Sequence, residues 1–304
     1  MMDWHSSITG FKIYLQLERS LSKHSIDAYV RDVSTLRTFV IENYPDISPL
    51  NLDLTKLKEC IHWISKREID NRSQARTISG IKAFYKFLMV EDLIKDDPTE
   101  LLESPKLGKY IPDVLSIDEI EQILQSIDLS TDRGHRDRAI VETLYGSGLR
   151  VSELVELRIT NIIQDQSFLR VTGKGNKERL VPTGEHALFH INTYLNQYRV
   201  HLPRIQNHED FVFLNKFGKK LSRISIFNII KECVARAGIH KSISPHTFRH
   251  SFASHLVEGG ANLRVVQEML GHESITTTEI YTHLDKDFLR ENLINFHPIH
   301  KKKS

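Results

Sequence analysis

A chain of 304 residues, 40% of them hydrophobic, is long enough for one large or two ordinary domains and too apolar to be disordered as a whole. Its formal net charge of +2 does not by itself indicate nucleic-acid binding, and the small basic excess lies beyond residue 104. Any DNA-binding surface must therefore come from local clustering of lysine and arginine. The two cysteines, Cys60 and Cys233, have no metal-binding spacing, which favours buried thiols in a reducing compartment.

The sequence predicts a cytoplasmic protein. Its N-terminal segment carries Asp3, His5 and Lys12 and lacks the basic start and apolar core of a signal peptide. No apolar run approaches the ~20 residues that a membrane helix needs. We therefore expect no membrane partner.

Residues 1–103 are expected to form a four-helix bundle. Hydrophobic residues recur at helical spacing in four stretches, residues 8–17, 22–40, 54–64 and 78–88. The second stretch begins with a serine, which is a favoured N-cap, and the short connections are typical of a small bundle. Residues 104–112 follow with two prolines, a glycine and no periodicity, so we place a linker there.

Residues 113–304 are expected to form a second domain. Ser116 and Glu119 have the spacing of a capping box at its first helix. Residues 168–172 and 179–182 are predicted to be strands joined by a glycine-rich turn. Helices are predicted from residue 186 nearly to the end, interrupted by an apolar piece at 211–214. The expected fold class is mainly α, with a small antiparallel sheet in the C-terminal domain.

Two basic residues are associated with glycine-rich turns. Arg150 follows Gly146-Ser147-Gly148, whose glycines would let the backbone approach a phosphate closely. Glu153, three residues further on, could buttress the arginine. A plain turn and a surface pair of Arg150 with Glu153 explain the same pattern. Lys174 lies at the hairpin tip, where it could donate a proton to a leaving group or simply be solvated. Gly-Lys-Gly lacks the spacing of a nucleotide-binding loop.

A second pair, His246 and Arg249, lies at the predicted start of a helix. Ser244 is a suitable N-cap and Pro245 suits the first helical position. His246 and Arg249 are three residues apart and share one helix face. A helix N-terminus with a projecting arginine suits an anion, whereas a solvated face is the plainer alternative. His246 and His250 lack an acidic or cysteine partner at zinc spacing, which argues against a metal site.

His272 and Tyr281 lie on the segment that follows. Gly271 is expected to end one helix, and Tyr281 is expected to lie on the next, a short one. A tyrosine hydroxyl is a poor nucleophile at neutral pH because its unperturbed pKa is ~10, so it needs a nearby base and positive charge. Taken alone, such a position is more often a core tyrosine.

Together and in this order, these residues resemble the pattern of the tyrosine recombinase (phage integrase) family. That pattern is an arginine, a lysine on a β-hairpin, His-x-x-Arg, a second histidine or tryptophan, and a tyrosine. The matching positions are Arg150, Lys174, His246, Arg249, His272 and Tyr281. The resemblance covers the whole chain, and segments 148–154, 173–179 and 263–267 are similar to the Xer branch, the chromosome dimer resolvases.

The resemblance implies an N-terminal DNA-binding domain and a catalytic domain that clamp duplex DNA. Tyr281 would attack the scissile phosphate and form a 3′-phosphotyrosyl link, while the two arginines neutralise its oxygens. Lys174 would protonate the departing 5′-oxygen, His246 would help remove the tyrosine proton, and His272 would hydrogen-bond the phosphate. Because the phosphotyrosine keeps the bond energy, the resemblance implies no cofactor, metal or ATP.

The resemblance also implies partners. Four protomers would act on two dif-like DNA sites, as a heterotetramer of this chain and a paralogous, XerC-like recombinase. The DNA translocase FtsK would be a further partner. The C-terminal segment 288–296 is similar to the family's tail that docks into a neighbouring protomer, and packing on its own domain is the alternative. Four basic residues of the first domain are candidates for phosphate contacts, with a solvated helix face as an equal alternative: Arg72, Arg76, Lys82 and Lys86.

Three other functions stay open at this point. A mobile-element integrase would use the same chemistry at another target site. A type IB topoisomerase would relax DNA without a defined partner site. A DNA-binding architectural protein would have lost catalysis, and the six matching positions argue against it because such a descendant would be free to lose some of them.

Overall fold

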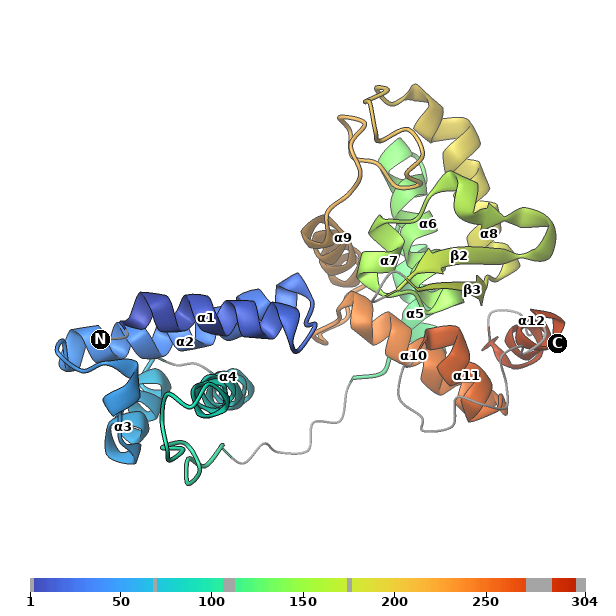
Figure 1. The fold of residues 1–304 in the computed structure, drawn as a ribbon. Helices are drawn as coiled ribbons and strands as arrows, with labels where there is room; N and C mark the ends of the chain where they lie inside the picture. Colours follow the sequence, from blue (N-terminus) through green and yellow to red (C-terminus); the bar gives the residue numbers. More distant parts are fainter. Residues whose placement is uncertain (1–2, 68–69, 106–112, 174–176, 272–285, 299–304) are drawn as a thin grey trace. The chain divides into compact units, whose positions relative to one another are not determined.

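The structure, a computed structural model, describes residues 3–67, 70–105, 113–173, 177–271 and 286–298. Two compact units make up the chain, Met1–Tyr110 and Ile111–Ser304 (Figure 1). Within the described residues, no helix combines the length and the apolar character needed to cross a bilayer.

The described part of the N-terminal unit contains four α-helices. They are α1 (Trp4–Leu17), α2 (Lys23–Asn43), α3 (Leu54–Ser65) and α4 (Asn71–Val90), with a 3-10 turn at Pro49–Asn51. Each α-helix begins after a residue whose side chain accepts a backbone N–H of the first turn: Asp3, Ser22, Asp53 and Asp70. The predicted four-helix bundle and its serine cap are confirmed.

An aromatic cluster lies in the core of this bundle. Phe84 of α4 is fully buried. Its ring centroid lies 5.4–6.3 Å from four other aromatic rings, those of Trp4, Phe11, Tyr85 and Phe87. Such edge-to-face and offset pairs add to the free energy gained by burying apolar area. The apolar face of α4 therefore packs against α1, and α4 also contacts α2.

The C-terminal unit contains eight α-helices in its described part. They are α5 (Ile117–Gln125), α6 (Asp132–Ser147), α7 (Val151–Val155), α8 (Glu185–Thr193), α9 (Arg223–Arg236), α10 (Pro245–Gly259), α11 (Leu263–Leu270) and α12 (Lys286–Phe296). Short 3-10 turns lie at Ile159–Asn161, Gln164–Gln166 and Arg199–His201, and a π-helical turn at Tyr194–Tyr198. The predicted capping box at Ser116 and Glu119 begins α5.

A small antiparallel sheet lies in this unit, with strand order β1-β2-β3. β2 (Phe168–Thr172) pairs with β3 (Glu178–Pro182) from Phe168 opposite Pro182 to Thr172 opposite Glu178. β1 is a two-residue strand, Ile162–Ile163, too short for a periodicity to reveal. The predicted mainly α fold with a small antiparallel sheet is confirmed.

The helical prediction beyond residue 186 is only partly right. Residues 202–222 contain turns and isolated bridges instead of helix. Phe211 bridges to Arg158 and Leu214 to Lys220, and Phe211–Leu214 are buried. The apolar piece at 211–214 therefore anchors a longer loop to the core.

The C-terminal helix packs on its own unit. Leu289 and Leu293 of α12 are buried in the main core, and α12 contacts α10, α11 and β3. In this single chain, segment 288–296 therefore packs on its own domain, which was the alternative to docking into a neighbouring protomer. Figure 1 shows α10, α11 and α12 as neighbours.

Replacement of Phe84 tests the aromatic core. We expect Phe84→Ala to lower the free energy of unfolding of the full chain by about 3–5 kcal/mol, because it removes a large buried ring and leaves a cavity. Urea unfolding followed by circular dichroism measures the change. Phe217→Ala is the control, since that ring is 62% exposed and its loss should change stability by about 0.5 kcal/mol or less. Equal stability of the two variants would contradict the assignment of the core.

Candidate active site

The buried carboxylate of Glu153 organises the candidate site. This side chain of α7 is 2% exposed. Arg150 donates its backbone N–H (2.8 Å) and its Nη1 (2.9 Å) to it. Arg179 of β3 donates Nη1 (2.7 Å) and Nη2 (3.0 Å), and Nη1 of Arg249 on α10 lies 4.0 Å away. One acidic group therefore faces three arginines from three segments of the chain.

The C-terminal end of α11 accepts hydrogen bonds from the same arginines. The last carbonyls of a helix have no partner inside it and carry partial negative charge. Three consecutive carbonyls each accept one bond: Met269 O from Arg179 Nε at 3.2 Å, Leu270 O from Arg249 Nη2 at 2.6 Å, and Gly271 O from Arg150 Nη2 at 2.9 Å. The arginine cluster thus ties β3, α7 and α10 to the end of α11.

The electrostatics of the cluster keep its charged groups ionised. Burial alone would raise the pKa of Glu153, but hydrogen bonds and charge from Arg179 and Arg150 outweigh it and lower the pKa. Burial, helped by the like charge of Arg150, lowers the pKa of Arg249 to about 10. Arg249 therefore keeps its positive charge at neutral pH.

A glycine turn brings Arg150 and Arg249 together. Gly148 ends α6 with φ 59°, in the left-handed region that glycine adopts at little cost. A Cβ at this position would lie 2.5 Å from the ring of Phe252, so the packing also excludes a side chain. The Gly148 carbonyl accepts a bond from Arg249 Nη1 at 2.7 Å. In the described structure, the groups that lie close to the Gly148 backbone are therefore the guanidinium of Arg249 and the ring of Phe252.

Among the predicted catalytic positions, the structure brings Arg150 and Arg249 together. His246 lies one helical turn before Arg249 and is exposed. Ser244 caps α10 and Pro245 is its first residue, as predicted. The two residues of the His-x-x-Arg motif therefore lie in the first turns of α10, with His246 exposed and Arg249 buried.

Three predicted catalytic residues, Lys174, His272 and Tyr281, lie outside the described residues. The described structure reaches the edges of both segments. Gly173 N donates to Lys177 O at 2.8 Å, which closes the arms of the hairpin. Gly271, directly before His272, ends α11 and accepts the bond from Arg150.

Two residues of the cluster were underestimated from the sequence. Glu153 was expected either to support Arg150, as it does, or to form a surface pair with it, and the surface alternative is wrong because the carboxylate is buried. Arg179 had no predicted role. In sequence it resembles Arg170 on the neighbouring strand, which is exposed. The difference in burial between Arg170 and Arg179 comes only from the strand pairing and from the packing of β3 against α11.

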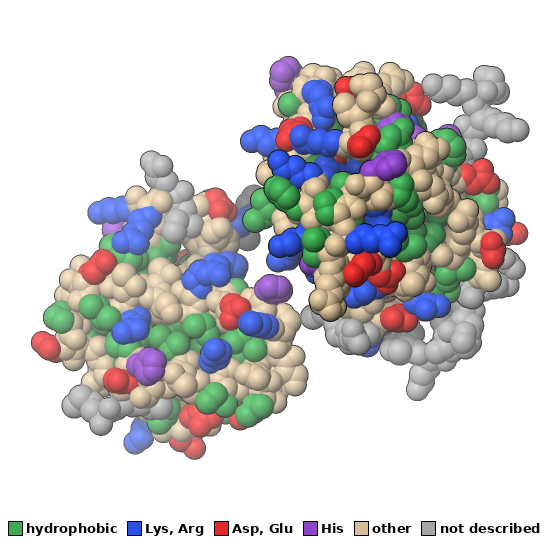
Figure 2. Space-filling view, turned by 90° about the horizontal axis from the view of Figure 1, so that it is seen from above, with side chains coloured by type: hydrophobic (Ala, Val, Ile, Leu, Met, Phe, Trp, Pro, Cys, Tyr) green, Lys and Arg blue, Asp and Glu red, His purple; other side chains and the backbone are tan. Residues whose placement is uncertain are grey.

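The basic candidates of the N-terminal unit lie along α4. Arg72, Arg76, Lys82 and Lys86 fall on one side of this helix, given 3.6 residues per turn. Arg76 Nη1 pairs with the buried carboxylate of Asp32 at 2.7 Å, although its side chain stays 49% exposed. Figure 2 shows lysine and arginine side chains interspersed with acidic ones on the visible face of each unit, as the low net charge predicts.

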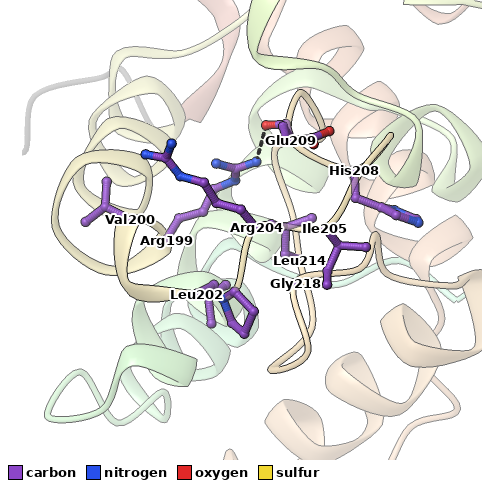
Figure 3. A pocket seen from close by; sticks show the side chains of 10 residues that line it. Arg199, Val200, Leu202, Arg204, Ile205, His208, Glu209, Leu214 and Gly218 are labelled. Carbon is purple, nitrogen blue, oxygen red and sulfur yellow. Dashed lines mark hydrogen bonds between the residues drawn. The ribbon is translucent and has the colours of Figure 1, made fainter.

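In the C-terminal unit, a hollow of about 240 Å³ is lined by residues between positions 199 and 218, and none of the predicted catalytic residues lines it (Figure 3). Arg199 points toward the loop and donates to the carbonyls of Glu209 and Phe211. Its guanidinium therefore stabilises the loop. Across the described part of the chain, no group of three or more His, Cys, Asp or Glu side chains is arranged to hold a metal ion.

Comparison with known proteins places the chain in a family. Residues 113–287 match the model of the phage integrase family, and residues 8–92 match the phage integrase N-terminal SAM-like domain. The chain therefore belongs to the phage integrase family. It is a tyrosine recombinase, an enzyme that transfers DNA strands at specific sites.

Its similarity extends to particular members. The chain is 42% identical over 286 residues to tyrosine recombinase XerD of Staphylococcus epidermidis, covering 94% of this chain and 96% of that protein. The XerD of Staphylococcus aureus gives the same values. In the sequence, segments 104–107 and 297–298 look more like XerD than XerC. They therefore predict a XerD-like member, and the identity to XerD confirms this prediction.

Solved structures support the fold. The XerH site-specific recombinase bound to difH substrate aligns with a TM-score of 0.70 at 20% identity, covering 93% of this chain and 95% of that one. A lambda integrase (75–356) dimer bound to a COC′ core site also gives 0.70 at 18% identity, with 93% and 100% covered. At these identities the similarity is one of fold.

Removal of the Glu153 charge tests the cluster. We expect Glu153→Gln to lower the free energy of unfolding at pH 7 by about 3–5 kcal/mol, because it leaves partly buried arginines without their counter-charge. Glu156→Gln at the end of α7 is the matched control. Its carboxylate is 54% exposed and pairs with Lys220, so its loss should cost about 1 kcal/mol or less.

The effect of Glu153→Gln should depend on pH. The folded protein holds the pKa of Glu153 below its ordinary value of 4.5. The stabilisation is therefore fully present above 4.5 and is lost as the pH falls through the folded-state pKa. Urea unfolding at descending pH should show the gap between wild type and variant narrowing. A gap of constant size well below pH 4.5 would contradict the ionised, arginine-bound carboxylate.

Proposed function

We propose that this chain is a XerD-like recombinase that cuts and rejoins DNA through a 3′-phosphotyrosyl intermediate and resolves chromosome dimers at a dif-like site. The observation that carries the proposal is the convergence of Arg150 and Arg249 at the end of α11, directly before His272. Two guanidiniums held together by backbone carbonyls form a preorganised site for a phosphate. The 42% identity to XerD over 94% of the chain supports it further.

In the proposed reaction, the hydroxyl oxygen of Tyr281 forms a bond to phosphorus while the bond from phosphorus to the 5′-oxygen breaks. His246 helps to take the tyrosine proton, and Lys174 gives a proton to the 5′-oxygen. His272 hydrogen-bonds the phosphate. The 5′-hydroxyl of a partner strand then reverses the attack, which exchanges strands. One phosphodiester bond is made for each one broken, so the reaction needs no metal, ATP or other cofactor.

Arg150 and Arg249 would neutralise the non-bridging oxygens in the transition state. A guanidinium has five N–H donors, and the bonds of Arg249 to Gly148 and Leu270 use two of them. The pKa of about 10 keeps Arg249 charged at neutral pH. Its fixed direction means that little reorganisation is needed when the phosphate charge develops.

We assign residues 1–103 to a DNA-binding domain, 104–112 to a linker and 113–304 to the catalytic domain. The division of the chain into two compact units and the separate family matches at 8–92 and 113–287 support this assignment. Basic residues of α4 would contact phosphates in sequence-independent fashion. Among them, Arg76 would do so while held by Asp32.

The proposed partners are duplex DNA with a dif-like site, a XerC-like recombinase that completes a heterotetramer, and the translocase FtsK, all in the cytoplasm. What supports them is the similarity to XerD. Strand exchange between two dif-like duplexes, measured with and without a XerC-like paralogue, tests the partner requirement. Complete exchange by the chain alone would overturn the heterotetramer.

Replacement of Tyr281 tests the nucleophile. Wild-type protein incubated with a nicked duplex that carries a dif-like site should give a DNA-linked band on a denaturing gel. Tyr281→Phe should abolish that band and leave specific DNA binding near wild type in a gel shift, because only the attacking oxygen is lost. Tyr198→Phe, on the π-helical turn, is the control and should keep the band. Equal cleavage by Tyr281→Phe would sink the assignment.

Removal of divalent ions tests the metal-free mechanism. The covalent band should form to the same extent in EDTA as in its absence, because the arginines supply the positive charge that a metal would otherwise provide. A strict requirement for a divalent ion would refute the mechanism. The order of addition should not matter, so chelation before and after DNA binding serves as the internal control.

A further inference from the structure

Arg179 of β3 connects the two parts of the arginine cluster. All three of its guanidinium nitrogens are engaged, Nη1 and Nη2 by Glu153 at 2.7 and 3.0 Å and Nε by Met269 O at 3.2 Å. Its side chain is only 16% exposed. A two-pronged pair of this kind fixes direction as well as distance. Arg179 therefore sets the position of Glu153 relative to the end of α11.

The geometry also shows what Arg179 prevents. Glu153 is buried and needs compensating charge. Arg249 Nη1 lies 4.0 Å from its Oε2. Without Arg179, Arg249 is a guanidinium close enough to move toward the carboxylate and away from the carbonyls of Gly148 and Leu270. Because Arg179 already donates two hydrogen bonds to Glu153, Arg249 keeps its bonds to the carbonyls of Gly148 and Leu270.

Arg179 also packs against the backbone at the end of α11. Gly271 has φ 65°, and a Cβ there would lie 2.9 Å from Nε and 3.0 Å from Cζ of Arg179. The stem of the arginine thus lies over Gly271, whose carbonyl accepts the bond from Arg150. Both arginines of the proposed phosphate site are therefore placed through contacts that Arg179 makes.

We propose that Arg179 is a positioning residue of the recombination reaction. By holding Glu153 and the end of α11, it directs Arg150 and Arg249 at the DNA phosphate without touching the DNA itself. This inference rests on the proposed function and extends it to a residue whose three guanidinium nitrogens all bond groups of the protein itself.

The test separates DNA binding from cleavage. For Arg179→Gln, we expect the affinity for the nicked dif-like duplex to stay within about twofold of wild type, while the cleavage rate constant at saturating protein falls about 100-fold, as a misplacement near 1 Å produces. Arg179→Lys keeps the charge beside Glu153 but not the two-pronged geometry, so it should recover part of the rate. Gel shifts and single-turnover covalent trapping measure the two quantities.

A double-mutant cycle tests the route through Glu153. If Arg179 acts by holding that carboxylate, Glu153→Gln combined with Arg179→Gln should cleave at about the rate of the slower single variant. Multiplied rate losses would overturn the route. Arg158→Gln is the matched control, because Arg158 also pairs with a carboxylate, that of Asp210 at 3.5 Å, but is 48% exposed. It should cleave like wild type.

The outcomes distinguish this inference from the proposed function. Absence of a covalent complex with wild-type protein would refute the proposed function, and the inference would fall with it. A wild-type complex together with wild-type cleavage by Arg179→Gln would overturn the inference alone. Should Arg179→Gln fail to fold, Arg179→Lys decides, since cleavage at the full wild-type rate would show that the two-pronged geometry is not needed.

Discussion

The carboxylate of Glu153 is the interaction on which the arrangement of the catalytic unit depends. It is buried where an isolated charge would be very costly, and it is tolerated because Arg150 and Arg179 donate four hydrogen bonds to it. Those arginines in turn need acceptors, which the end of α11 provides. The strand β3, the start of α7 and the end of α11 therefore depend on one another. Displacement of any one of them would leave a buried charge without a partner.

Such a cluster is a weak source of net stability. Desolvation of several charges offsets much of the attraction between them, and apolar side chains of similar volume often do as well or better. What the cluster supplies is direction. Each guanidinium is held by acceptors at defined positions, so positive charge is already in place before a phosphate arrives. This is the preorganisation that a metal-free transesterification requires.

In its described part, the N-terminal unit also holds a buried carboxylate that pairs with an arginine. Asp32 on α2 is 2% exposed, and burial raises its pKa even though Arg76 and Thr77 oppose the shift. A Cβ on Gly80 would lie 2.6 Å from the Asp32 side chain, so the glycine makes room for it. Arg76 of α4 bonds this buried carboxylate, and its side chain remains partly exposed to solvent. The pairing restricts where Arg76 can point, which bears on its proposed role at DNA.

Much of the fold was predictable because its signals are local. Helix periodicity, N-caps such as Ser22 and Ser244, and the hairpin glycines depend on residues within a few positions of each other. The loop at 202–222 was missed because its apolar piece, Phe211–Leu214, is buried by contacts with distant segments. β1 was missed because two residues carry no period.

By itself, the sequence determined the two helical units, the sheet and the order of chemical residues that indicates a tyrosine recombinase. Motif order is a property of the chain and survives without coordinates. The tertiary structure decided which charges are buried and which side chains meet. Arg170 and Arg179 are the same residue type on paired strands, yet one is exposed and the other binds Glu153. That difference arises from the packing of β3 against α11, a contact between residues some ninety positions apart.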